Sequence, residues 1–102
     1  VRLPGGDDPD ANCWLTPLLV DPAAAGWRAA DLAAALAAAD VETRPMWQPM
    51  HRQPAFAGCP AHLTGVADRF FADGLMLPNG SATPDAALDR MWAAVHAFLE
   101  GA

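Results

Sequence analysis

The side chains best suited to chemistry in this 102-residue chain gather in one stretch, Glu42–Phe56 (ETRPMWQPMHRQPAF). It contains Arg44, Trp47, His51 and Gln53. An arginine offers a planar fork of N–H donors for a phosphate or carboxylate, and an indole can stack on a ring or on the face of a sugar. The residue types therefore favour binding of a polar or aromatic ligand, rather than a covalent reaction.

We call residues 42–56 the proline segment, because it also contains Pro45, Pro49 and Pro54. Each proline lacks an N–H group and pushes the residue before it towards extended geometry, so the spacing predicts an extended, semi-rigid, non-helical segment. A purely structural alternative remains open, in which Trp47, Met46 and Met50 fill gaps in the core. At least one of the two methionines is expected to do so.

Two other kinds of site are less well supported. Metal ligands would come from Cys13, Cys59, His51, His62 and His96. Only Cys59 and His62 have a usable separation, and no second close pair completes a zinc-binding pattern. A nucleophile formed by Cys59 with His51 or His62 is disfavoured, since nothing indicates a helix N-terminus that would activate the thiol.

The remaining ionisable groups are expected on helix surfaces. Four aspartates fall on the polar sides or ends of the predicted helices, where contact with solvent is the ordinary explanation: Asp68, Asp73, Asp85 and Asp89. His96 is expected at the surface or boundary of the last helix. None of these residues is predicted to belong to a site.

Composition excludes several function classes. The formal net charge of −6 argues against a nucleic-acid partner, and no apolar run or basic amphipathic helix indicates a membrane partner. The chain has no lysine, which excludes a Schiff base on a lysine side chain of this chain. Two cysteines are too few for a disulfide framework, so we expect free thiols and a cytoplasmic protein.

The elements that must position the proline segment follow from hydrophobic patterns. A strand is expected at residues 13–21, on a sheet edge or with a bulge because of Pro17. Helices are expected at 27–39, from Leu63 to Gly74, and from Thr83-Pro84 to Gly101, with Thr83 as the N-cap and Pro84 first in the helix. Short strands are expected at 41–45 and 75–77.

This order predicts an α+β fold, a small sheet of short strands with about three helices packed on it. Residues 1–11 are expected to be a lead-in and residues 12–102 the domain. The first residue is Val rather than Met, and the chain is expected to be a piece of a longer protein.

Three strings of residues carry a resemblance to a known family. They are Asn12–Thr16 (NCWLT), the string from Glu42 to Phe56, and Gly74–Ser81 (GLMLPNGS). In this order and spacing they resemble the pyridoxal-phosphate-dependent sugar aminotransferases of the DegT/DnrJ/EryC1/StrS group. Compared with that pattern, Gln48 stands where lysine is usual and Asn79 where serine is usual.

The resemblance implies that the chain is the C-terminal small domain of a fold-type I aminotransferase. The whole enzyme would move an amino group, commonly from glutamate, to a keto group on a nucleotide-linked sugar. A missing N-terminal large domain would supply the Schiff-base lysine and hold pyridoxal phosphate, so this chain alone would hold no cofactor or metal, supply no catalytic residue and be inactive. The full-length protein would be a homodimer.

For the site, the resemblance implies that His51 is the first candidate for a contact with the sugar nucleotide, followed by Arg44 and Trp47. Arg44 would bind a phosphate or anchor the proline segment. Trp47 would pack on the substrate or on the large domain. The alternative is a non-catalytic module that binds sugar nucleotides or mediates dimerisation with the same small fold.

Overall fold

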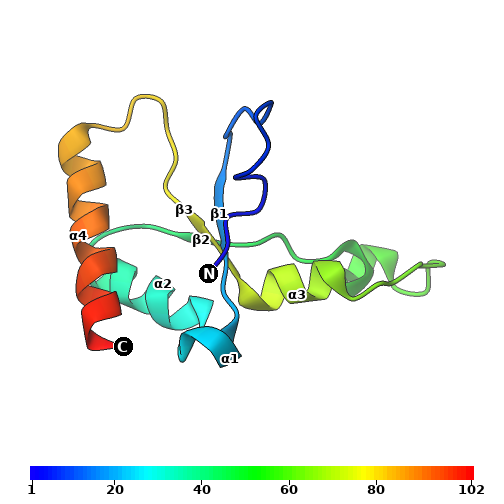
Figure 1. Ribbon diagram of the computed structural model, residues 1–102. Helices are drawn as coiled ribbons and strands as arrows, with labels where there is room; N and C mark the ends of the chain where they lie inside the picture. The colour runs from blue at the N-terminus through cyan, green and yellow to red at the C-terminus, as the bar shows by residue number, and fades with distance from the viewer.

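The computed structural model describes all residues, 1–102, and has an antiparallel sheet of three strands. These are β1 (Thr16–Leu19), β2 (Arg44–Pro45) and β3 (Gly74–Leu77), in the order β1-β3-β2. Four α-helices accompany the sheet: α1 (Pro22–Ala25), α2 (Ala29–Ala38), α3 (Val66–Asp73) and α4 (Asp85–Gly101). The α+β prediction is confirmed (Figure 1).

β3 is the centre of the sheet, and all four of its residues are buried. Leu77 pairs with Thr16 of β1 on one side, and Met76 pairs with Arg44 of β2 on the other. Because β1 is an edge strand, Pro17 is tolerated there, as predicted. β1 is shorter than the predicted strand at 13–21, and before it Arg2 forms an isolated antiparallel bridge with Leu19.

α2 packs against β3 and against α4, and these elements form most of the core. Leu32 and Leu36 of α2 are almost completely buried, and both belong to one cluster with Leu75 and Met91. Trp27, which precedes α2, meets Phe98 of α4 edge-to-face with 5.1 Å between ring centroids. In Figure 1, α4 stands at the left and α2 below the sheet, whereas α3 extends to the right.

Several helix boundaries differ from the predictions. The short helix α1 was not predicted; Asp21 begins it by accepting a hydrogen bond from the N–H of Ala23 at 3.1 Å. α3 begins at Val66, three residues later than expected. α4 begins at Asp85, because Pro84 has extended backbone and occupies the N-cap position that was predicted for Thr83.

The prediction that the proline segment is wholly non-helical was wrong. It runs extended to Pro49 and then forms two 3₁₀ turns, η1 (Met50–Arg52) and η2 (Pro54–Phe56). A 3₁₀ turn needs only one i→i+3 bond, such as the 3.0 Å bond from the Gln53 N–H to the Met50 carbonyl. Pro54 opens the second turn, where its missing N–H costs no bond.

One of the two methionines of the proline segment fills space, in agreement with the prediction that at least one would. Met46 is half-buried, and its side chain lies against Gly74 at the start of β3. Met50 is exposed. None of the helices is both long and apolar enough to cross a membrane.

Candidate functional site

A cavity of about 450 Å³ opens where β2 and β3 meet the loop after β3 and the start of α4. Its lining is partly apolar, with Met76, Leu77 and Met91 at its inner wall. Its polar lining includes Glu42, Arg44, Asn79, Thr83 and Arg90. A mostly apolar pocket with a few convergent polar groups is the usual form of a small-molecule site. This cavity is therefore the first candidate for a binding site.

Arg44 and Trp47, two of the three residues singled out from the sequence, both line this cavity. The guanidinium of Arg44 forms a 2.7 Å ion pair with Glu42, and both side chains are about three-quarters exposed. A pair this exposed contributes little to stability, and the guanidinium has further N–H donors. Arg44 is thus available to an anionic ligand.

Trp47 is one of two exposed indoles that lie together. Its exposed fraction is 63% and that of Trp14 is 71%, and their ring centroids are 6.4 Å apart with planes tilted by 32°. The backbone beside Trp14 is held by Asn79, whose side-chain N–H donates a 2.6 Å hydrogen bond to the Cys13 carbonyl. Asn79 stands where serine is usual in the family pattern. It has a structural role here, because its side chain links the segment before β1 to the loop after β3.

Arg90 was missed by the sequence analysis. It is exposed on α4, directly before the buried Met91, and lines the same cavity as Arg44. The sequence did contain a signal for Arg90, namely its position next to Met91 in the apolar stripe of the predicted helix. A helix residue beside a core position lies at the edge of the apolar face, where it can border a pocket.

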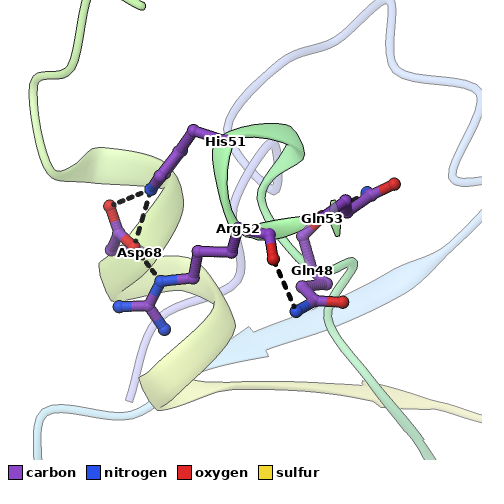
Figure 2. Close-up of polar contacts among 5 residues, drawn as sticks. All are labelled: Gln48, His51, Arg52, Gln53 and Asp68. Atoms are coloured by element: carbon purple, nitrogen blue, oxygen red, sulfur yellow. Dashed lines mark hydrogen bonds and ion pairs between the residues drawn. The ribbon is translucent and has the colours of Figure 1, made fainter. Parts of the chain in front are cut away.

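His51, the third predicted residue, lies apart from the cavity and against α3. Its Nε2 atom is 3.1 Å from each carboxylate oxygen of Asp68 (Figure 2). Arg52 reaches the same carboxylate, with its Nε donating to Oδ1 at 2.6 Å. The His51 and Asp68 side chains are only 23% and 28% exposed.

The expectation that Asp68 is simply solvated was therefore wrong. A helical pattern marks Asp68 as polar, but it cannot show that a turn seventeen residues earlier in sequence folds onto it. The surface prediction for His96 is confirmed, since its side chain is exposed on α4.

The two glutamines of the proline segment hold the 3₁₀ turns in shape. Gln53 donates from Nε2 to the Gln48 carbonyl at 3.0 Å, and Gln48 donates from its own Nε2 to the Arg52 carbonyl at 3.5 Å. Figure 2 shows the Gln48 amide below Arg52. Gln48, which stands where lysine is usual in the family pattern, therefore bonds to the backbone of this segment through its side chain.

No other arrangement of reactive side chains forms. Cys13 and Cys59 are both free and exposed, as predicted for the thiols. No hydrogen bond joins Cys59 to His51 or His62, and no three His, Cys, Asp or Glu residues lie together as metal ligands would.

Comparison with known proteins gives the context for this geometry. The family model of the DegT/DnrJ/EryC1/StrS aminotransferases matches residues 1–96. The chain belongs to this family. EpsN of Bacillus subtilis (strain 168), assigned as a pyridoxal phosphate-dependent aminotransferase, is 37% identical over 75 residues. The match includes 70% of this chain and 19% of EpsN, and no solved structure matches the chain.

The chain thus spans about a fifth of the length of this aminotransferase relative. Enzymes of the family depend on pyridoxal phosphate, which is bound covalently through a lysine amine. This chain contains no lysine. Its own residues therefore do not fit covalent attachment of that cofactor.

Proposed function

We propose that this chain is the C-terminal small domain of a pyridoxal-phosphate-dependent aminotransferase. The whole enzyme transfers an amino group, commonly from glutamate, to a keto group on a nucleotide-linked sugar. The match to the aminotransferase family over residues 1–96 is the observation that carries this proposal. The small share of EpsN that the chain spans, and its lack of lysine, support a separate large domain that holds the cofactor.

Within this enzyme, we assign substrate contacts to the extended part of the proline segment and to its first 3₁₀ turn, η1. Arg44, with Arg90 across the cavity, offers N–H donors to the phosphates of a sugar nucleotide. Trp47 offers an exposed indole face to a sugar or base. His51 contacts the substrate from the turn η1. The chain itself binds and orients substrate, and the amino-group chemistry belongs to the large domain and its cofactor. The enzyme works as a cytoplasmic homodimer.

The proposal is tested with the protein encoded by the whole gene, supplied with pyridoxal phosphate, glutamate and a series of nucleotide-linked keto sugars. We expect transamination of at least one of them. We expect Trp47→Ala and His51→Ala each to lower kcat/KM for the sugar about tenfold or more, as loss of one good contact does.

Matched controls come from α4. Trp92 is half-exposed and does not line the cavity, and His96 is exposed. Trp92→Ala and His96→Ala should leave the sugar kinetics near those of the wild type. A gene that encodes no large domain, or a whole protein that binds sugar nucleotides without transamination, would favour the non-catalytic binding or dimerisation module instead.

A further inference from the structure

Asp68 of α3 contacts both His51 and Arg52, and this geometry determines which ring nitrogen of His51 carries the proton. Asp68 lies in the first turn of α3, and its carboxylate meets two successive residues of η1. Arg52 donates to Oδ1 at 2.6 Å, and the His51 Nε2 atom lies 3.1 Å from each oxygen. An ionised carboxylate can only accept hydrogen bonds. The proton of a neutral His51 ring is therefore placed on Nε2, where it points at Asp68.

This arrangement leaves Nδ1 as the ring nitrogen without a partner in the chain. With the proton on Nε2, Nδ1 carries a lone pair and accepts a hydrogen bond. The groups that can donate to it are hydroxyl and N–H groups, and sugars are rich in hydroxyls. The partly buried position of both side chains keeps the ring from turning freely.

We propose that Asp68 is a positioning residue for the aminotransferase. It holds His51 so that Nδ1 accepts a hydrogen bond from a hydroxyl group of the nucleotide-linked sugar. The inference rests on the proposed function, since it takes His51 as a substrate contact. The polar side chains that the Asp68 carboxylate bonds are His51 and Arg52, and Asp68 acts on the substrate through the imidazole.

A purely structural role for Asp68 makes a different prediction. As a carboxylate in the first turn of α3, Asp68 also favours the helix dipole, and its ion pair with Arg52 and its hydrogen bond with His51 fasten η1 to α3. If fastening η1 were its only role, removing the Arg52 contact should lower kcat/KM for the sugar as much as a change at Asp68 does. If Asp68 positions His51, only changes that alter His51 should lower kcat/KM for the sugar.

Asp68→Asn separates the two roles. The amide oxygen can keep the bond from Arg52, which leaves the amide NH₂ facing Nε2. Nε2 lies 3.1 Å from both oxygens of the wild-type carboxylate, so in the variant it keeps one acceptor and meets a donor in place of the other. That donor is satisfied only when Nε2 accepts, which shifts the imidazole proton towards Nδ1. In that tautomer Nδ1 donates instead of accepting, while the packing around α3 is retained.

The experiment uses the whole enzyme and follows its two half-reactions separately. The glutamate half-reaction is read from the cofactor absorbance, and the second half-reaction from amination of the keto sugar. We expect Asp68→Asn to lower kcat/KM for the sugar about tenfold and to leave the glutamate half-reaction unchanged. Arg52→Gln, and Asp89→Asn as an exposed control on α4, should stay near the wild type.

Equal losses in Asp68→Asn and Arg52→Gln, or a loss in both half-reactions, would reduce Asp68 to a structural anchor and overturn the inference. Sugar kinetics of Asp68→Asn equal to the wild type would overturn it as well. A wild-type enzyme in which neither glutamate nor another amino-acid donor converts the cofactor would refute the proposed function itself, and the inference with it. The half-reaction with the amino donor therefore tells the two failures apart.

A second pair of variants tests the ring nitrogen directly and does not depend on the folding of Asp68→Asn. The amide of asparagine lies near the position of Nδ1, whereas the amide of glutamine reaches the position of Nε2. His51→Asn should therefore keep more activity towards the sugar than His51→Gln. The opposite order would assign the substrate contact to Nε2 and contradict the role of Asp68.

Discussion

Gly74 is the residue at which the proline segment packs against the sheet. It is buried at the start of β3, and its φ of −103° is accessible to any residue. A Cβ atom there would collide with the side chain of Met46 and with the Phe70 carbonyl oxygen. Glycine is therefore required for lack of space, and not for backbone freedom.

We expect Gly74→Ala to lower the free energy of unfolding by about 1–3 kcal/mol, the usual cost of overpacking. Urea unfolding of the protein provides the measurement. Adding Met46→Ala should recover part of the loss, because one of the two obstructing groups is then removed. Gly101 has open space around it at the end of α4, so Gly101→Ala should be neutral or slightly stabilising. A Gly74→Ala protein as stable as the wild type would show that β3 can shift.

Among single residues, the sequence allowed prediction of site candidates whose types are unusual for their surroundings. Arg44 stood out because a proline-rich segment does not need it for packing, and Trp47 because an indole can stack on a ligand; the structure brings both to one cavity. Arg90 and Asp68 did not stand out. A polar residue on a helix is compatible both with solvent and with a partner from a distant turn, and only the tertiary structure decides between these.

α2 is the element that fixes the helical layer to the sheet, through Leu32 and Leu36. Leu36 is completely buried, whereas Leu99 on α4 is 47% exposed. We expect Leu36→Ala to lower the free energy of unfolding by about 2–5 kcal/mol, since a cavity is left in the core. Leu99→Ala should cost far less. Thermal and urea unfolding of the two variants give the comparison, and equal losses would contradict this account of the core.

The longer elements were predictable because burial imposes a period on the sequence. The apolar stripes of α2 and α4 and the apolar run of β3 each follow from one face or both faces being covered. α1, η1 and η2 could not be found in this way. They are single turns held by local bonds, such as the capping bond from Asp21, and carry no periodic pattern.

The whole chain is extended for its size and has a small core. Its radius of gyration is 15.4 Å, compared with about 13 Å for a compact domain of this length. Only 12 of the 102 residues are buried, and Trp14 and Trp47 are largely exposed. The sequence pattern shows which residues are apolar, but it cannot show that these indoles lack a cover within the chain. The proposed large domain accounts for both features, because it would complete the cover.

This account predicts that the chain is stabilised when it is part of the whole protein. Burying the Trp14 indole, which is 71% exposed in this chain, would contribute about 2–3 kcal/mol. We therefore expect Trp14→Ala to reduce the free energy of unfolding of this domain more in the whole protein than in the 102-residue chain alone. The matched control is Trp92→Ala on α4, which should change both proteins by the same amount. Hydrogen exchange of β3 amides measures the stability of the domain in each setting, because β3 is the buried central strand. Equal effects of Trp14→Ala in the two settings would mean that the indole pair stays exposed to solvent, and that another surface carries the contact with the large domain.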